Sequence, residues 1–428
     1  MGKSSLAIEG GPKAVTVPLE DRWQVASGLE KQFVNAVLDD LGASYSQLGL
    51  LEQEFRDFVG TKHAIVMCNG TATLHSAIFA SGARQGTEVI VPSITWHASI
   101  TPILHCGATP VFCDADPDTY CADPADVGRR ITERTRAIVV THVYGNPADM
   151  GSFRELVKGT GIKLIEDASH AHGGLWDGQQ VGSLGDVGCF SLQQSKAVTG
   201  VEAGVATTDD DDLYDAMLAL GQYGRCEQLF VTERFRRLRN MGLGIKYRAN
   251  PLAVAMARAQ LRRLPELNEK RTAWFAKLNE LLAPVPGVQP QKTYAKAKRG
   301  GMLLYTGRID PEVVGAPVDA VLKALVAEGV KTTPGITPFG YGVMHLEPLF
   351  NDFPFEGLGG PWADLPAGAR RPMGRGSLPV SEAIHDTAFW LSTPVDPSDE
   401  WVEQTAAAFA KVVEHADRVA QWAAGLAS

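Results

Sequence analysis

Two residues of the sequence, Lys196 and Asp167, could together support chemistry on an amine. Lys196 follows residues 185–191, an apolar stretch of small residues that is typical of a buried strand. Burying an ammonium group is costly, so a lysine there has a lowered pKa and a nucleophilic amine that can form a Schiff base. Asp167 ends another apolar stretch, where a carboxylate would point into a ligand crevice. Taken alone, Lys196 could equally well be a surface lysine, and an aspartate in the position of Asp167 is more often a helix cap than a ligand-binding group.

A candidate anion-binding turn lies between an expected strand at 63–67 and an expected helix at 72–81. Backbone N–H groups and a hydroxyl at the start of a helix face an anion, and the helix dipole adds to the attraction. The residues concerned are Gly70, Thr71 and Ala72 in the turn and Ser191, whose hydroxyl is close to Lys196 in the sequence. An ordinary turn with a helix cap is the alternative explanation.

Trp96 follows the second expected strand, where its ring could stack on a planar ligand or simply pack in the core. The sequence thus places an anion cradle, an aromatic platform, a carboxylate and a lysine after successive strands. Pyridoxal 5′-phosphate (PLP) needs a phosphate anchor, a ring stack, a partner for its pyridine nitrogen and an amine for its aldehyde. The combination therefore predicts PLP as the cofactor.

The elements that must position these residues form a regular pattern between residues 60 and 195. Short stretches rich in Val and Ile alternate with helical stretches, and a helix is expected from Thr95. The expected strands are 63–67, 88–91, 110–113, 137–141 and 163–166. This pattern is typical of an α/β protein with a parallel sheet, in which ligands bind at the carboxyl ends of the strands.

Two domains are expected from a change of composition near Pro251. Residues 251–283 have helical spacing, whereas residues 284–300 are rich in Pro, Lys and Gly and resemble a domain junction. We therefore expect an N-terminal segment and a large cofactor-binding domain over residues 1–283. A smaller C-terminal α/β domain is expected over residues 284–428.

The length and composition are typical of a large folded protein and argue against several kinds of partner. The chain has 428 residues, 45% of them hydrophobic, and a net charge of −9, which allows a large buried core. No basic face for nucleic acid, no secretory signal and no apolar run of roughly 18 residues that could span a membrane is visible. The six cysteines form no CxxC pair, which favours a reducing compartment. We expect a cytoplasmic protein that binds neither nucleic acid nor membrane, and no metal site.

Several motifs carry a family resemblance that spans essentially the whole chain. They are Leu6-Ala7-Ile8-Glu9-Gly10-Gly11-Pro12, Gly70-Thr71-Ala72, Glu166-Asp167-Ala168, Gly185-Asp186-Val187-Gly188, Phe190-Ser191 with Lys196, Tyr247-Arg248, and Leu378-Pro379 with Glu382. The chain resembles the DegT/DnrJ/EryC1/StrS family of PLP-dependent sugar and cyclitol aminotransferases. The resemblance implies a fold-type I aminotransferase with a mostly parallel seven-stranded sheet in its large domain. It also implies a homodimer with shared active sites.

The resemblance implies a role for each site residue. Lys196 would carry the cofactor as a Schiff base, and Asp167 would pair with the pyridine nitrogen. Trp96 would stack on the ring, and His170 would lie near the phenolic oxygen. The residues that would hold the phosphate are Gly70, Thr71, Ala72 and Ser191.

The chain departs from the family pattern at three places. Val201-Glu202-Ala203-Gly204 replaces the usual Gly-Glu-Gly-Gly, so the loop has less backbone freedom. Lys246 stands where the family often has an Asn that reaches the phosphate of the neighbouring subunit, and it could do the same or be irrelevant. Gln193 replaces a usual His. The resulting Gln-Gln-Ser-Lys sequence is similar to the branch that acts on ketocyclitols and to aminohydroxybenzoate synthases.

The resemblance implies transfer of an amino group from glutamine, glutamate or alanine to a ketocyclitol or keto-sugar, in antibiotic or other secondary-metabolite biosynthesis. Some relatives instead dehydrate sugars and have His at the lysine position, so Lys196 argues against dehydration here. The altered loop at 201–204 leaves that alternative open. A non-enzymatic sensor is a third alternative, which the retained Lys196 and Asp167 disfavour. The Gly- and Pro-rich residues 333–377 are expected to help select the substrate.

Overall fold

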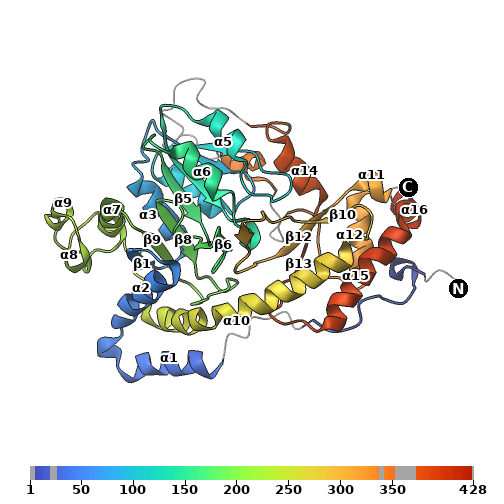
Figure 1. The fold of residues 1–428 in the computed structure, drawn as a ribbon, viewed down its shortest axis with the longest axis horizontal. Coiled ribbons are helices and arrows are strands. Elements are labelled where there is room, and N and C mark those ends of the chain that lie inside the picture. Colours follow the sequence, from blue (N-terminus) through green and yellow to red (C-terminus); the bar gives the residue numbers. More distant parts are fainter. Residues whose placement is uncertain (1–4, 20–26, 337–341, 352–372, 427–428) are drawn as a thin grey trace.

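The computed structural model describes residues 5–19, 27–336, 342–351 and 373–426. A seven-stranded sheet forms the centre of the larger part of the molecule (Figure 1). In spatial order its strands are β1 (His63–Met67), β9 (Gly204–Thr208), β8 (Val187–Ser191), β5 (Lys163–Asp167), β4 (Thr135–Thr141), β2 (Glu88–Pro92) and β3 (Thr109–Cys113). Within this sheet β9 runs antiparallel to both of its neighbours and the other adjacent pairs are parallel, which confirms the expected mostly parallel sheet.

The sheet is buried on both faces because helices cover it from both sides. Adjacent residues Ile65 and Val66 of β1 belong to opposite hydrophobic cores. The core on the Val66 side includes residues of α2 (Ser46–Val59), α5 (Pro124–Arg130), α6 (Met150–Val157) and α10 (Pro251–Leu282). The core on the Ile65 side includes residues of α3 (Gly70–Ala80), α4 (Thr101–His105) and α7 (Asp211–Gly221). Burial on both faces explains the apolar runs of Val and Ile within strands such as β1, β2 and β4.

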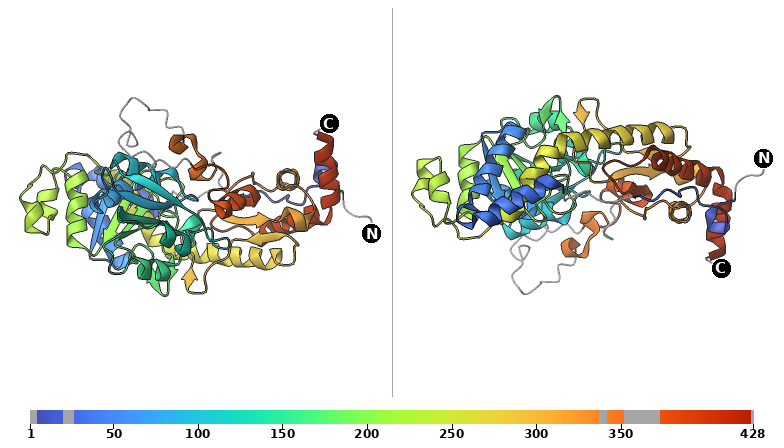
Figure 2. Two further views of the ribbon diagram at one scale, coloured as in Figure 1. Left: turned by 90° about the horizontal axis from the view of Figure 1, so that it is seen from above. Right: turned by 90° about the horizontal axis from the view of Figure 1, so that it is seen from below.

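A smaller C-terminal part packs around a three-stranded sheet in the order β10-β12-β13. Its main elements are β10 (Val288–Pro290), β12 (Tyr305–Ile309), β13 (Ala388–Leu391), α12 (Val318–Ala327), α15 (Asp399–Glu414) and α16 (Ala416–Leu426). The 32-residue α10 runs across both parts (Figure 2) and contributes Leu264 to the first core and Leu278 to the C-terminal core. The domain boundary expected between residues 283 and 284 stays a prediction.

The N-terminal segment packs against the C-terminal part. Leu6 and Val15 belong to the C-terminal hydrophobic core. The fully buried carboxylate of Glu328 accepts hydrogen bonds from the N–H groups of Ala7 at 2.8 Å and Ala14 at 2.9 Å, and Lys411 pairs with the same carboxylate at 2.8 Å. The first and last described parts of the chain therefore lie together, at the end opposite α8 and α9 (Figure 1).

The remaining helices and strands are short, apart from α1. They are α1 (Gly28–Asp39), β6 (Leu175–Trp176), β7 (Gln179–Gln180), α8 (Cys226–Leu229), α9 (Glu233–Arg236), β11 (Ala297–Lys298), α11 (Pro311–Val314), α13 (Pro348–Asn351) and α14 (Pro379–Thr387), with 3-10 turns η1 (Ala7–Glu9), η2 (Leu41–Ala43), η3 (His97–Ser99), η4 (Val143–Gly145) and η5 (Met344–Leu346). The helix expected from Thr95 begins later, with η3 and then α4. The Thr95 hydroxyl is bonded to those of Ser99 at 2.7 Å and Thr141 at 2.8 Å, which holds this stretch at the end of the sheet.

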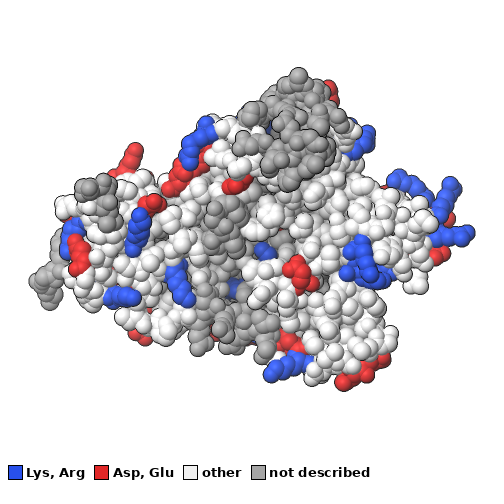
Figure 3. All heavy atoms as spheres, turned by 180° about the vertical axis from the view of Figure 1, so that it is seen from behind, with Lys and Arg blue, Asp and Glu red and all other residues white. Residues whose placement is uncertain are grey.

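Charged side chains of both signs are interspersed on the face seen in Figure 3. In the described part of the chain, no helix is long and apolar enough to cross a membrane. Much of the Gly- and Pro-rich stretch at 333–377 lies outside the described residues, namely 337–341 and 352–372.

Candidate active site

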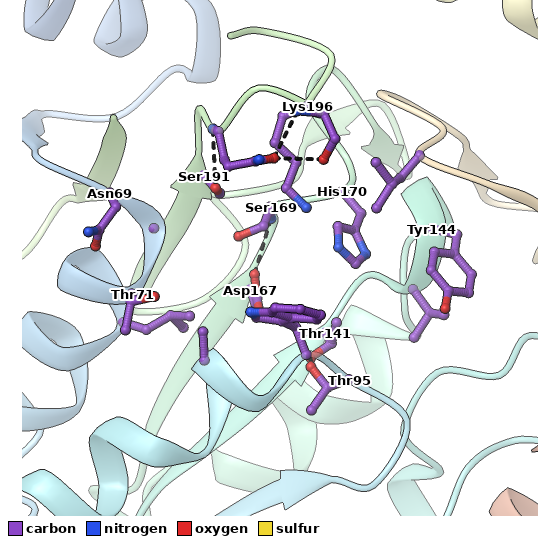
Figure 4. Close-up of a pocket in the computed structure, with 18 of the residues that line it drawn as sticks. Asn69, Thr71, Thr95, Thr141, Tyr144, Asp167, Ser169, His170, Ser191 and Lys196 are labelled. Carbon is purple, nitrogen blue, oxygen red and sulfur yellow. Dashed lines mark hydrogen bonds between the residues drawn. The ribbon is translucent and has the colours of Figure 1, made fainter. Parts of the chain in front are cut away.

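A cavity of about 330 Å³ lies at the carboxyl ends of the parallel strands. Thr141, Asp167 and Ser191, which are the last residues of β4, β5 and β8, line it. Figure 4 shows Lys196 reaching into the cavity from the loop after β8. The cavity is therefore where an α/β fold is expected to bind its ligand.

The cavity brings together seven of the nine site residues predicted from the sequence. They are Gly70, Thr71, Trp96, Asp167, His170, Ser191 and Lys196. Ala72 and Lys246 are not among the residues that line it. The two exceptions have different causes, which are described below.

Lys196 follows a tight turn that Gln193 organises. The Lys196 N–H donates to the Gln193 carbonyl oxygen at 2.9 Å, and the Gln193 side chain accepts from the Ser195 N–H at 2.8 Å. Burial lowers the pKa of Lys196 to about 8, although the Asp167 charge acts in the opposite direction. Near neutral pH a larger fraction of this amine is therefore uncharged than in an ordinary lysine, which favours its action as a nucleophile.

Asp167 is oriented by a chain of hydroxyl groups that the sequence analysis missed. Its side chain is buried, with Oδ2 accepting from Ser99 Oγ at 2.6 Å and Oδ1 accepting from the Ser169 N–H at 3.1 Å. Ser99 is in turn bonded to Thr95 at 2.7 Å. Hydroxyl residues directly after predicted strands were the available signal for this network.

The N-terminus of α3 forms the candidate anion cradle. Asn69 caps the helix, because its Oδ1 accepts from the Ala72 N–H at 2.8 Å. That bond uses the Ala72 N–H, which explains why Ala72 stays out of the cavity. A Cβ on Gly70 would lie 2.6 Å from Ser191 Cβ, so glycine is needed for α3 to approach β8 this closely.

The loop at 201–204 keeps the one glycine that its packing requires. A Cβ on Gly204 would lie 2.5 Å from the Asn69 carbonyl oxygen. Ala203 is buried, and Glu202 lines the cavity, where burial raises the pKa of its carboxyl. Val201 has a φ of 67°, a conformation that is unusual for a β-branched residue, and it is 54% exposed.

His170 and Tyr144 lie on the side of the cavity away from the cradle residues Asn69 and Thr71 (Figure 4). Their rings are stacked, with centroids 5.6 Å apart and planes at 11°. Burial, with smaller effects from Lys196 and His172, lowers the pKa of His170 well below its ordinary value, so the ring is neutral. His170 Nδ1 is buried and has no hydrogen-bond partner among the described residues. Tyr144, with a φ of 53°, was not predicted as a site residue.

Lys246 lies on an exposed segment outside the cavity. Its backbone forms an isolated bridge with Gln222, and the neighbouring Tyr247 carbonyl oxygen accepts from the Cys68 N–H at 2.6 Å. The segment is therefore connected to the end of β1, directly before the cradle. Part of the preceding basic stretch at residues 234–239 forms the short helix α9.

The groups in the cavity fit PLP. A helix N-terminus with the Thr71 and Ser191 side chains suits a phosphate, and the Asp167 carboxylate suits a protonated ring nitrogen. The orphaned His170 Nδ1 lacks the partner that a cofactor oxygen would provide. In the described part of the chain, no group of three or more His, Cys, Asp or Glu residues is arranged to hold a metal ion. The fold and the cavity define a PLP-dependent aminotransferase of fold type I.

The chain belongs to the DegT/DnrJ/EryC1/StrS aminotransferase family, whose model matches residues 27–353. GDP-perosamine synthase of Caulobacter vibrioides is 35% identical over 76% of this chain and 84% of its own length. A putative L-glutamine:3-amino-2,3-dideoxy-scyllo-inosose aminotransferase of Streptoalloteichus tenebrarius is 31% identical over 97% of this chain and 99% of its own. The crystal structure of DesI with its TDP-sugar product superposes with a TM-score of 0.79 at 28% identity, covering 98% of both chains.

Proposed function

We propose that this protein transfers an amino group from an amino acid to a ketocyclitol or a keto-sugar. The observation that carries the proposal is that Lys196 and the Asp167 carboxylate lie in one cavity. Burial there lowers the pKa of Lys196 to about 8. An uncharged amine is both a nucleophile and a base, and transamination requires both properties. L-Glutamine, glutamate and alanine are the proposed donors, in that order.

Each residue in the cavity has a role that suits its position. When bound, PLP supplies an aldehyde that condenses with amines and a ring that accepts the electrons of a broken C–H bond. Lys196 would hold that aldehyde in the resting enzyme, and its freed Nζ would take the proton from the α-carbon of the donor and deliver it to the cofactor carbon that carried the aldehyde. Asp167 keeps a proton on the ring nitrogen, Trp96 covers the ring and His170 contacts the phenolic oxygen.

The phosphate is assigned to the N-terminus of α3. Thr71 and Ser191 offer hydroxyl groups there, and the absence of a side chain on Gly70 allows both to approach one anion. Ala72 supports this site through its capping bond to Asn69 rather than through a direct contact. The helix dipole adds to the stabilisation of the phosphate charge.

A ketocyclitol is the favoured acceptor. The Streptoalloteichus relative, which is similar to this chain over almost its whole length, is named for L-glutamine and an amino-inosose. The GDP-perosamine synthase of Caulobacter vibrioides has a higher identity over a shorter match and is named for a GDP-linked sugar. A nucleotide keto-sugar is therefore the second candidate.

We also propose a homodimer in which Lys246 contacts the phosphate bound to the partner subunit. In support, Lys246 is exposed, and a 2.6 Å hydrogen bond between Tyr247 Oη and His75 Nδ1 orders the segment beside it. A cation on an ordered, exposed segment is suited to reach across an interface to an anion.

The proposal is tested with purified protein loaded with PLP. We expect L-glutamine to convert its absorption to that of the pyridoxamine form, and a ketocyclitol to reverse the change. Lys196→Ala should remove the covalent attachment and abolish turnover while the protein still folds, because no other group replaces Nζ. Turnover like that of the wild type in this variant contradicts the proposal, and loss of water from a sugar without amino transfer would favour the dehydratase alternative.

A further inference from the structure

The side of the cavity away from the phosphate cradle contains residues that are far apart in the sequence. We use the name far wall for Tyr144, Ile336 and Gly342, all of which line the cavity. The Tyr144 hydroxyl donates to the Ile336 carbonyl oxygen at 2.5 Å, which joins two of the three. An acceptor substrate bound beside Lys196 would extend toward this wall, because Figure 4 places Tyr144 opposite Asn69 and Thr71.

Gly342 belongs to a segment that is anchored to the end of β2. The Met344 N–H donates to the Ser93 carbonyl oxygen at 3.0 Å, and the His345 N–H donates to Ser93 Oγ at 3.2 Å. Ser93 Oγ also bonds to His345 Nδ1 at 2.7 Å. Ser93 directly precedes Ile94, Thr95 and Trp96, which line the cavity, so these bonds set the spacing between two of its sides.

The His345 ring also connects the segment that contains Gly342 to α14. His345 Nε2 lies 3.0 Å from Glu382 Oε1, and both side chains are buried. Glu382 also accepts from the N–H groups of Gly376 and Leu378, so its carboxylate acts as an acceptor throughout. An ionised carboxylate has no proton to donate, so His345 must donate from Nε2, which leaves Nδ1 to accept the Ser93 hydroxyl proton. Every bond in the chain Ser93–His345–Glu382 then has a defined direction.

A second residue of α14 contacts the other end of the far wall. The Ile336 N–H approaches His385 Nδ1 at 3.4 Å. A Cβ on Gly335 would lie 3.0 Å from His385 Cε1, and one on Gly342 would lie 3.5 Å from His385 Nε2. Gly335 and Gly342 therefore both pack against the His385 ring.

The helix itself is fixed to the large sheet. Asp114, directly after β3, accepts from the N–H groups of Val380 at 3.1 Å and Ser381 at 2.7 Å, which satisfies the first turn of α14. Glu382 and His385 are three residues apart and so lie on neighbouring positions of one helix face. The large sheet thus positions α14 through Asp114, and α14 positions both ends of the far wall through Glu382 and His385.

We propose that α14 sets the width of the substrate side of the cavity through two positioning residues, Glu382 and His385. This inference rests on the proposed function and deepens it. The wall suits a ring-shaped ketone, which is large enough to touch it, whereas a small keto acid can react with the amine of the cofactor without reaching it. The wild-type pyridoxamine form should therefore react faster with scyllo-inosose than with pyruvate.

The test removes each end of the support with a small substitution. Ser93→Ala deletes the hydroxyl that His345 contacts but keeps the backbone bond to Met344, and His385→Ala removes the ring under Gly335 and Gly342. For each variant we expect about a tenfold rise in KM for scyllo-inosose, with kcat and the L-glutamine half-reaction within about twofold of wild type. His385→Asn should restore the lower KM, because its Oδ1 can accept where Nδ1 does.

Thr387→Ala is the matched control, since its hydroxyl contacts only the Ala383 carbonyl oxygen of the same helix in the described structure. A second readout is amide hydrogen exchange over residues 342–347, which should accelerate in Ser93→Ala while exchange over α3 stays unchanged. An equal fall in both half-reactions, an unchanged KM, or a wild-type preference for pyruvate would overturn the inference. Absence of a half-reaction with L-glutamine, glutamate and alanine alike in the wild type would instead remove the proposed function, and the exchange experiment would still test the support of the far wall.

Discussion

Asp167 illustrates how much of this site depends on neighbouring residues. Its two oxygens accept from Ser99 Oγ and from the Ser169 N–H, which orients the buried carboxylate. Ser99 is in turn held by Thr95, whose hydroxyl also contacts Thr141 at the end of β4. The position of the carboxylate is therefore fixed before any ligand binds, which is a requirement for electrostatic catalysis.

Asp167→Asn should keep part of the bound cofactor and lose most of the transamination activity. A neutral amide cannot stabilise a protonated ring nitrogen as a carboxylate does. Single-turnover rates with L-glutamine measure the effect. A rate within about threefold of wild type, equivalent to roughly 0.7 kcal/mol of barrier, would be too small for the proposed role.

The lowered pKa of Lys196 makes the stability of the cofactor-free protein depend on pH. The folded protein releases this proton near pH 8, whereas the unfolded chain holds it to about the ordinary lysine value of 10.5. Between these values the unfolded state binds more protons, so the contribution of Lys196 to stability becomes more favourable as pH rises. The free energy of unfolding of wild type minus that of Lys196→Met should increase from pH 8 to 10, measured by urea denaturation. A flat or falling difference would contradict the burial of this amine.

At the scale of the elements, the contact between α3 and β8 determines the shape of the cradle. Helix and strand approach closely at Gly70 and Ser191, and Gly204 of β9 closes against Asn69 from the other side. Small residues at these positions allow three backbone segments to surround one anion. The cradle is thus a property of how the elements pack rather than of one motif.

Gly70→Ala should weaken cofactor binding by about tenfold or more, because its Cβ would displace Ser191 or tilt α3. Gly49→Ala is the matched control. In the first turn of α2, a Cβ at Gly49 meets nothing within 4 Å, so alanine should raise stability by up to about 1 kcal/mol and leave cofactor binding unchanged. Equilibrium titration with PLP compares the two variants. Equal affinities would mean that the close approach of α3 to β8 is not needed.

The sequence was sufficient to predict six of the seven strands of the large sheet, all except β9, and most residues of the cavity. Runs of Val and Ile report burial on both faces, and the residues that follow the strands necessarily meet at one edge. The sequence was not sufficient for the far wall, because Tyr144, Ile336 and Gly342 are brought together by contacts over long sequence separations. The sequence also could not show that the Ala72 N–H donates to the Asn69 side chain. A helix cap and an anion contact are predicted by the same local sequence pattern.

At the scale of the whole molecule, the site lies in the large part but depends on residues from the C-terminal part. Ile336 and Gly342 line the cavity, and α14 supports them from residues 379–387. If the proposed dimer forms, Lys246 adds a contribution from a second chain. Each site would then combine segments from three separate parts of the assembly.

Lys246→Ala should weaken cofactor retention without dissociating the dimer. Mixing Lys246→Ala chains with Lys196→Ala chains should restore activity, because one site of the mixed dimer then has both lysines. Activity after unfolding and refolding the mixture, compared with each homodimer, measures the effect, and Lys298→Ala, at another exposed lysine, is the control. No gain over the Lys246→Ala homodimer would exclude action of Lys246 across the interface.

The attachment of the N-terminal segment to Glu328 and Lys411 affects the order in which the protein can fold on the ribosome. Leu6 and Val15 are synthesised well before Phe409 and Val412, which complete the same core. At a synthesis rate of about 5–20 residues per second, the segment waits roughly 20–80 seconds for these partners. The large sheet can assemble during that interval, whereas the C-terminal core closes only after α15 has been synthesised.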